Sequence, residues 1–169
     1  MRVICWNSQG LKKPQVVPEV KFLIKSQKPD IMFLIETMIN DVNVQKILPT
    51  FCFDQFDYVP PINHSGGIAV MWNNDNVHVS VLSKDSRSIH LLVYDIRLQK
   101  TSVIFGLYGP AQKRDKHSFW DKLIELNTVI DLPWCLIGDL NEILSPDEKL
   151  GGLLPNSDRF HFLPKFLAS

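Results

Sequence analysis

The chain has 169 residues, and its 18 Lys and Arg balance 18 Asp and Glu, so the formal net charge is zero. With 45% hydrophobic and 21% charged residues it has the composition of one ordinary folded domain, which excludes intrinsic disorder, collagen-like repeats and charged tails. The balanced charge argues against a partner held mainly by bulk electrostatics but leaves room for a local basic groove.

The amino-terminal part of the chain predicts a strand, a helix and a second strand. Residues 2–6 are β-branched and aromatic and stop at a polar turn, which indicates a strand. From Val16 onward, apolar residues recur at helical spacing until Lys28 and Pro29, and the apolar run 31–35 then ends in Glu36. This βαβ order implies a sheet covered by a helix.

The middle of the chain predicts successive strands without an intervening helix. The strand-like runs are residues 66–72, 77–82, 89–96 and 102–108. The turn signals at residues 73–76 and 98–100 fit antiparallel hairpins and argue against a purely parallel, doubly wound sheet.

The last third predicts helix, strand and helix, which makes the whole chain mixed α/β. Asp115 is a suitable N-cap for a helix that Pro133 terminates. One stripe of this helix consists of Phe119, Leu123, Asn127 and Ile130, and it lies beside Trp120 and Ile124. Residues 134–138 form a buried strand that ends in Asp139, and residues 157–167 form a final helix.

The cysteines and the hydrophobicity pattern bear on the type of protein. Cys5, Cys52 and Cys135 lie far apart, which indicates neither a disulfide framework nor a zinc site. Two of them lie in strand-like runs, where we expect buried thiols. The start of the chain lacks the features of a signal peptide, and no apolar run approaches the roughly 18 residues of a membrane span. We therefore expect a soluble, intracellular protein without a membrane partner.

Polar residues recur at the ends of the predicted strands, which is the main functional signal. They are Asn7, Glu36, Tyr108, Asp139 and Asn141. Because strand ends in an α/β fold meet at one edge where loops build sites, residues distant in sequence can converge there.

Each acidic position allows a functional and a structural interpretation. Glu36 closes an apolar run and could be a ligand for Mg²⁺, which takes oxygen donors, or an acid exposed at a strand end. Asp139 and Asn141 would point the same way if the chain stays extended, and an acid and an amide so placed could orient a water against a phosphate. Alternatively, both are turn residues with local hydrogen bonds.

The remaining candidates are equally open. Tyr108 could donate its phenolic proton to an oxyanion or be half-buried packing, and Asn7 could orient Glu36, touch phosphate or belong to a turn. Basic residues in the predicted loops could contact phosphate or be solvated charge. They are Lys12, Lys13, Lys113 and Arg114, with Lys116 nearby.

Five segments together resemble the endonuclease/exonuclease/phosphatase superfamily, also called DNase I-like. In order, they are residues 5–11 (Cys-Trp-Asn-Ser-Gln-Gly-Leu), 29–37, 66–72, 107–110 (Leu-Tyr-Gly-Pro) and 137–143 (Ile-Gly-Asp-Leu-Asn-Glu-Ile). Residues 148–152 add a likeness to the apurinic-type endonuclease domain of plant LINE-type non-LTR retrotransposons. The resemblance covers essentially the whole chain.

This resemblance implies a four-layer α/β sandwich with mixed sheets and Mg²⁺-dependent phosphodiester hydrolysis, with Mn²⁺ as an alternative metal. It implies that Glu36 binds the metal with support from Asn7, and that Asp139 orients or deprotonates water. Asn141 and Tyr108 would hold the scissile phosphate. The implied partner is DNA and the implied location the nucleus, with no small-molecule cofactor; the oligomeric state stays open.

The chain also departs from the family pattern. A later Asp and a terminal Ser-Asp-His motif are absent, and position 9, often acidic in the apurinic branch, is Gln9. We therefore expect residues 1–169 to be the amino-terminal part of the domain, without its last strands.

Three functions follow as hypotheses. The first is a retrotransposon endonuclease part with little or no turnover, and the second is a non-catalytic remnant that binds nucleic acid or protein through an exposed sheet edge. The third is an inositol or sphingolipid phosphatase on the same scaffold, which the motif variants favour least.

Overall fold

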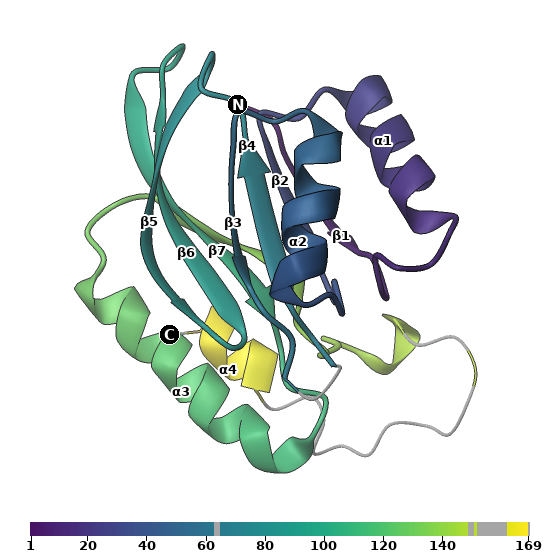
Figure 1. The fold of residues 1–169 in the computed structure, drawn as a ribbon. Coiled ribbons are helices and arrows are strands. Elements are labelled where there is room, and N and C mark those ends of the chain that lie inside the picture. The colour runs from purple at the N-terminus through teal and green to yellow at the C-terminus, as the bar shows by residue number, and fades with distance from the viewer. Residues whose placement is uncertain (63–64, 149–150, 152–161, 169) are drawn as a thin grey trace. The chain divides into compact units, whose positions relative to one another are not determined.

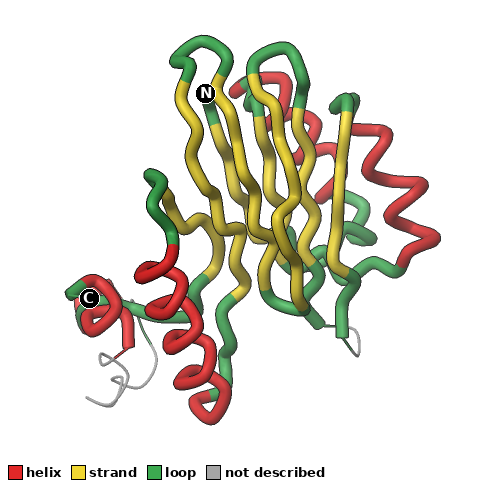
Figure 2. The backbone as a smooth tube through the Cα atoms, turned by 90° about the vertical axis from the view of Figure 1, so that its left-hand side faces the viewer, coloured by secondary structure: helices red, strands yellow, loops and turns green. Residues whose placement is uncertain are grey.

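Short runs of β-branched and aromatic residues form two mixed four-stranded sheets in the described part of the chain (Figures 1 and 2). The computed structural model describes residues 1–62, 65–148, 151 and 162–168. The chain divides into two compact units, of which the first comprises residues 1–108 and 132–139 and the second residues 109–131 and 140–169. Both sheets belong to the first unit.

The first sheet has the strand order β1-β2-β4-β3. Its strands are β1 (Val3–Asn7), β2 (Ile31–Ile35), β3 (Gln55–Val59) and β4 (Ile68–Trp72). Parallel pairing of β1 with β2 places Asn7 beside Ile35, and β4 runs antiparallel to both β2 and β3. Helices α1 (Val16–Gln27) and α2 (Asp41–Ile47) lie along this sheet, and a 3₁₀ turn (Leu48–Phe51) follows α2 (Figure 1).

The second sheet has the order β5-β6-β7-β8. Its strands are β5 (Val77–Asp85), β6 (Ser88–Asp95), β7 (Lys100–Tyr108) and β8 (Trp134–Asp139). The first three are antiparallel neighbours, whereas β8 runs parallel to β7 and pairs Asp139 with Tyr108. The carboxyl ends of β7 and β8 therefore lie side by side.

Strand β2 explains the position of both hydrophobic cores of the first unit. Because side chains alternate along a strand, Ile31, Phe33 and Ile35 face the second sheet, while Met32 and Leu34 face α1 and α2. All five side chains are fully buried. The apolar run of the sequence is therefore a strand covered on both faces, as the βαβ pattern predicts.

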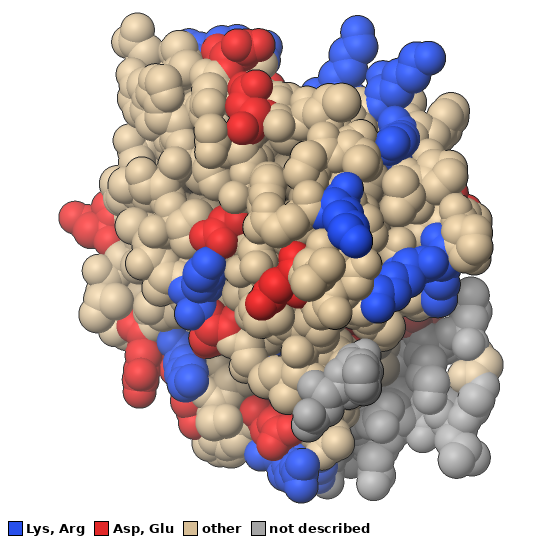
Figure 3. Space-filling model, in the orientation of Figure 1, with Lys and Arg blue, Asp and Glu red and all other residues tan. Residues whose placement is uncertain are grey.

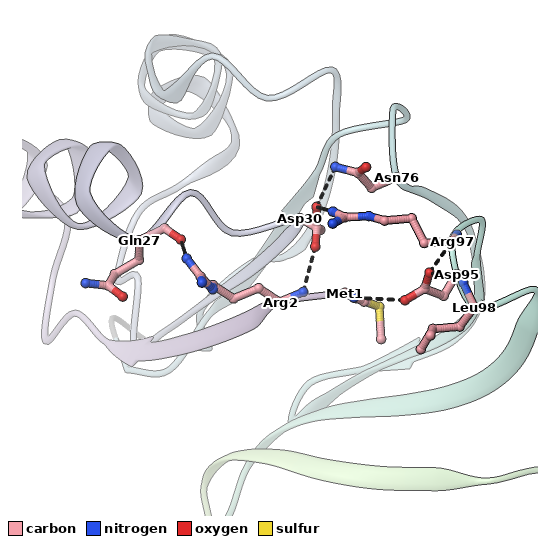
Figure 4. A network of polar contacts seen from close by, with 8 residues as sticks. All are labelled: Met1, Arg2, Gln27, Asp30, Asn76, Asp95, Arg97 and Leu98. Carbon is pink, nitrogen blue, oxygen red and sulfur yellow. Dashed lines mark hydrogen bonds and ion pairs between the residues drawn. The ribbon is translucent and has the colours of Figure 1, made fainter.

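A polar network links the two sheets at the strand ends opposite Asn7 and Tyr108 (Figure 4). Asp30, which precedes β2, accepts hydrogen bonds from Arg2 N and Asn76 Nδ2 and lies 3.6 Å from the Arg97 guanidinium. Asp95, at the end of β6, lies 2.9 Å from the Met1 ammonium. The buried Asp30 and Asp95 carboxylates thus have cationic or N–H partners, as buried charge requires.

The second unit contains α3 (Lys113–Val129), a 3₁₀ turn (Pro146–Glu148) and α4 (Phe162–Leu167). Lys116, Trp120 and Leu123 are the buried residues of α3, and the ring of Phe166 lies against Trp120 with centroids 5.4 Å apart. The beginning of the predicted helix 157–167 lies outside the described residues.

Several sequence predictions are wrong in their details. The 98–100 turn joins the antiparallel strands β6 and β7, but residues 73–76 carry the chain from the first sheet to the second instead of closing a hairpin. Helix α3 begins at Lys113 with Gln112 as N-cap, so Asp115 lies inside its first turn. Of the predicted stripe only Leu123 is buried, together with Trp120 beside it, and the third buried residue of the helix is Lys116.

Two further differences concern α2, β3 and the thiols. The sequence pattern predicts neither α2 nor β3, the first because it is only seven residues long and the second because Asp57 interrupts its apolar residues. All three cysteines are free, but Cys135 is exposed, whereas Cys5 is half-buried. No helix among the described residues has the length and apolar character to cross a membrane.

Candidate active site at the strand ends

Two hydrogen-bonded side-chain pairs connect the carboxyl ends of β1 and β2 with those of β7 and β8. Asn7 Nδ2 donates to Asp139 Oδ2 at 2.8 Å. The Tyr108 hydroxyl donates to Glu36 Oε1 at 2.6 Å. Residues 132 and 72 positions apart in sequence therefore meet across the facing sheets. We call Asn7, Glu36, Tyr108 and Asp139 the rim cluster.

The electrostatics of Tyr108 show that the two pairs form one cluster. Burial, followed by the hydrogen bond to Glu36 and the negative charges of Glu36 and Asp139, raises the pKa of Tyr108 to about 12. The positive charge of Arg87 acts in the opposite direction. Both carboxylates therefore act on one phenol. Because its pKa is raised, the Tyr108 hydroxyl stays protonated at neutral pH and serves as a hydrogen-bond donor.

The backbone around Glu36 is held in an unusual conformation. Glu36 has a φ of 54°, in the left-handed region that an L-residue occupies only when its surroundings demand it. Its carbonyl oxygen accepts a hydrogen bond from Gly10 N at 2.8 Å and lies 3.1 Å from the hydroxyl of buried Ser8. Thr37 N donates to Gly67 O at 3.1 Å. The turn after β1 thus fixes the turn after β2.

Asn7 makes the local contact of a turn residue and a second contact that the sequence did not predict. Its Oδ1 accepts a hydrogen bond from Gln9 N at 3.1 Å, as expected of a turn residue, while its Nδ2 orients Asp139. Among the described residues, the Asn7 side chain makes no direct hydrogen bond to Glu36, which was the predicted partner. Asn7 therefore positions the acid of β8 rather than the acid after β2.

Asn141 belongs to the second unit, where its surroundings differ from the sequence prediction. Its φ of 50° means that the backbone is not extended at Asn141, so the condition for the predicted placement of the two side chains is not met. Within its unit, Asn141 Nδ2 donates to Gly109 O at 2.8 Å. It is a turn residue with a fixed amide group.

The predicted basic residues do not form a single group. Lys12 and Lys13 are exposed in the turn before α1, and Lys113 and Arg114 are exposed in the first turn of α3 rather than in a loop. Lys116 is instead buried, which corrects its prediction as a loop residue. On the face drawn in Figure 3, basic and acidic side chains of the described residues are both widely spread.

Ser8 and Arg87 also contact the rim cluster, although neither was predicted from the sequence. The Ser8 hydroxyl donates to the carbonyl oxygens of Ile35 and Glu36, and the Arg87 carbonyl oxygen accepts a hydrogen bond from Tyr108 N at 2.8 Å. Ser8 follows Asn7 directly and acts on backbone groups, and Arg87 lies between β5 and β6 at neither of the strand ends that carry the cluster, so strand-end reasoning did not find them.

Burial, followed by the charge of Asp139, raises the pKa of Cys5 to about 12, so this thiol is protonated at neutral pH.

The donor atoms of the rim cluster fit a hard divalent cation. Glu36 and Asp139 offer carboxylate oxygens, and both side chains are only partly exposed. Among the described residues, no group of three or more His, Cys, Asp or Glu side chains could hold a metal ion. That absence is compatible with Mg²⁺, which typically binds through one or two carboxylates and keeps several waters.

The chain belongs to the endonuclease/exonuclease/phosphatase family, whose model matches residues 5–162. Its mixed α/β architecture with two mixed sheets is that of the DNase I-like fold. No curated protein sequence matches the chain.

Solved structures show the same fold at low sequence identity. The 3′-5′ exonuclease NExo from Neisseria meningitidis is 17% identical with a TM-score of 0.67, over 99% of this chain and 71% of that one. A structure of Neisseria NExo described as a 3′ phosphatase bound to product DNA hairpin is 15% identical with a TM-score of 0.64, over 99% of this chain and 70% of that one. AP endonuclease LMAP from Leishmania major is 19% identical with a TM-score of 0.57, over 83% of this chain and 55% of that one.

The human Nocturnin catalytic domain is 16% identical with a TM-score of 0.57, over 86% of this chain. The chain spans 66% of that domain, just under two thirds of its length.

Proposed function

We propose that this chain is a Mg²⁺-dependent phosphodiester hydrolase for DNA, and that residues 1–169 are the amino-terminal part of a LINE-type retrotransposon endonuclease with low turnover. The observation that carries the proposal is the rim cluster, in which two carboxylates, a protonated phenol and an amide converge from facing sheets. Family membership makes phosphoester hydrolysis the chemistry to expect of this cluster.

In this proposal Glu36 holds the metal, and Mn²⁺ can replace Mg²⁺. The bound cation would supply positive charge that polarises a phosphoryl oxygen. Glu36 Oε1 already accepts the Tyr108 hydrogen bond, and its carboxylate has a second oxygen with which to bind a cation. The left-handed backbone at Glu36 and its bonds to the β1 turn keep this carboxylate at the strand ends.

Asp139 is the group that orients or deprotonates the attacking water. The N–H bond from Asn7 fixes one oxygen of Asp139, so the carboxylate is set in one orientation. Tyr108 keeps its proton at neutral pH and donates a hydrogen bond to a phosphate oxygen when substrate is present. The family resemblance alone assigns Asn141, two residues after Asp139 in the sequence, an amide contact with phosphate.

DNA is the proposed substrate because two of the structural relatives carry that description. Neisseria NExo is bound to a product DNA hairpin, and LMAP is an AP endonuclease. Lys12, Lys13, Lys113 and Arg114 would contact the phosphate backbone, which positions DNA without reading its sequence. The retrotransposon assignment rests on the motif variants, and with it we propose a nuclear location.

A non-catalytic binding module is the second candidate, favoured by the coverage of the relatives. The chain spans only 55% to 71% of the LMAP and NExo structures. Strand β8, which carries Asp139, has one neighbouring strand among the described residues. A strand edge of this kind can pair with another polypeptide.

Plasmid nicking tests the catalytic proposal. We expect slow conversion of supercoiled to nicked DNA that requires Mg²⁺ or Mn²⁺, and a loss of about 100-fold or more in Glu36→Gln and Asp139→Asn, since removal of one member disables a catalytic unit. The matched control is Glu19→Gln, which changes an exposed acid on α1 and should leave the rate unchanged.

Two outcomes would contradict this proposal. Nicking that persists in both site variants would mean that the rim cluster is not the catalytic centre. No nicking by the folded chain with either metal would favour the binding module, and DNA affinity measured against salt would then show whether phosphate contacts dominate.

Metal binding has a separate test that needs no turnover. Mn²⁺ broadens nuclear magnetic resonance signals close to it, so titration of ¹⁵N-labelled protein should selectively broaden the amides of Glu36 and Thr37. Glu36→Gln should abolish this effect and Glu19→Gln should not. Equal broadening in wild type and Glu36→Gln would remove Glu36 from the metal site.

A further inference from the structure

Lys116 is a buried cation on α3 that the proposed chemistry does not use. Its side chain is 10% exposed, and that of its partner Glu142 is 1% exposed. Lys116 Nζ lies 2.8 Å from Glu142 Oε1 and donates to the carbonyl oxygen of Asn141 at 2.7 Å. Burial of an ammonium is costly unless it is paired and hydrogen-bonded, so this arrangement needs both partners.

The contacts of Lys116 converge on the backbone of one residue. Asn141 has a left-handed φ of 50°, and its carbonyl oxygen accepts the ammonium hydrogen bond. Its side-chain Nδ2 donates to Gly109 O, while a Cβ at Gly109 would meet the carbonyl oxygen of Leu140. Asn141 is therefore held at its carbonyl by Lys116 and at its amide by Gly109. We call Lys116, Glu142 and the Asn141 carbonyl the lysine clamp.

We propose that Lys116 is a positioning residue that sets the orientation of the Asn141 carboxamide. The proposal rests on the function proposed above, in which this carboxamide contacts the scissile phosphate. Glu142 follows Asn141 directly in sequence, so the ion pair and the carbonyl bond together fix the peptide on the carboxyl side of Asn141. A fixed peptide in an uncommon backbone conformation restricts where the side chain can point.

A direct contact between Lys116 and DNA phosphate is the competing explanation for a cation on this helix. The geometry disfavours it, because the ammonium is nearly buried and already engages a carboxylate and a carbonyl oxygen. Lys113 and Arg114, at the start of the same helix, are exposed cations that could reach a phosphate instead. Lys116 thus acts through Asn141 rather than on the substrate.

The first experiment measures the clamp without reference to activity. In ¹⁵N-labelled full-length chain, the carboxamide signals of Asn141 should shift and exchange faster with solvent in Lys116→Met, while Lys116→Arg retains the wild-type pattern. Lys122→Met, an exposed lysine on the same helix, is the matched control and should change nothing at Asn141.

A double variant protects the test against simple unfolding. Lys116→Met/Glu142→Leu removes both buried charges together, which commonly preserves folding, yet it still deletes the donor to the Asn141 carbonyl. We expect this folded protein to show the shifted Asn141 carboxamide. Wild-type Asn141 signals in the folded double variant would overturn the proposal.

The second experiment uses the nicking assay to separate positioning from a merely structural role. Lys116→Met should lower kcat about as much as Asn141→Ala with little change in KM, and the two together should lose no more than one alone. Lys116→Arg should recover most of the rate. Additive losses, or a loss confined to KM, would overturn the proposal. If no protein nicks DNA, the proposed function fails, and the resonance experiment still decides the clamp.

Discussion

At the scale of single residues, the rim cluster combines two kinds of hydrogen bond with different consequences. The hydrogen bond from Asn7 fixes the orientation of the Asp139 carboxylate. Burial, followed by the hydrogen bond to Glu36, raises the pKa of Tyr108 and so keeps the phenol protonated. The first bond therefore orients an acid, and the second keeps a hydrogen-bond donor in its neutral form.

Tyr108 should be the least acidic of the site's groups. Burial, the bond to Glu36 and nearby negative charge raise its pKa to about 12, so Glu36→Gln should lower that pKa by removing the negative charge of Glu36. Ultraviolet titration of the wild type and Glu36→Gln, with Tyr108→Phe to identify the signal, measures this shift. An unchanged phenol titration in Glu36→Gln would mean that the two side chains do not interact in solution.

The Asp95 carboxylate should make the free energy of unfolding depend on pH in the acidic range. The Met1 ammonium, and then the backbone N–H of Leu98, hold the pKa of Asp95 below its ordinary value. Its contribution is therefore complete above the unfolded-state pKa of about 4 and is lost as the pH falls through the lower folded-state pKa. Asp95→Asn should lower the urea midpoint at pH 7, and the difference from wild type should shrink in strong acid.

The control for this experiment is Asp75→Asn, which alters an exposed acid and should leave the midpoint within error. A difference between Asp95→Asn and wild type that stays constant from neutral pH into strong acid would show that the carboxylate charge of Asp95 contributes nothing.

The sequence predicted which side chains converge where their positions depend only on the direction of the strands that carry them. Asn7, Glu36, Tyr108 and Asp139 follow strands whose carboxyl ends share an edge, so their convergence could be predicted. The placement of Lys116 could not, because its burial depends on an ion pair with Glu142 across 26 residues of chain. The left-handed backbone of Asn141 was equally hidden, since Asn tolerates both extended and turn conformations.

At the scale of secondary structure, long periodic segments were predictable and short ones were not. The pattern of α1 and the apolar run of β2 agree with the structure because burial imposes a clear period on each. The seven-residue α2 is too short to show a period and depends on its Asn40 cap and on packing. Turn residues 73–76 predicted a turn correctly but could not tell a hairpin from a crossing between sheets.

Close packing between the sheets makes Gly106 on β7 sensitive to substitution. A Cβ at this position would meet the ring of the fully buried Phe33 on β2. Gly106→Ala should therefore destabilise the protein by about 1–3 kcal/mol, the usual cost of overpacking. Chemical denaturation measures this cost, with Ser102→Ala on the same strand as control. Equal stability of the two variants would show that the sheets are not packed as described.

At the scale of the first unit as a whole, β2 belongs to both hydrophobic cores. It has a strand on each side and packed side chains on each face, so its amides can exchange only when much of the unit opens. Native-state hydrogen exchange should give the slowest rates for β2 and faster rates for β8. Exchange of β2 as fast as that of β8 would mean that the two cores open independently.

The sequence separations within the rim cluster also set a time at which the site can first exist. Asn7 is synthesised 132 residues before its partner Asp139. Such long-range contacts form only after the intervening chain has been ordered, because loop closure must come first. While the intervening residues are being synthesised, the nascent chain carries Asn7 and Glu36 without their partners, and it acquires the assembled cluster only when β8 joins β7.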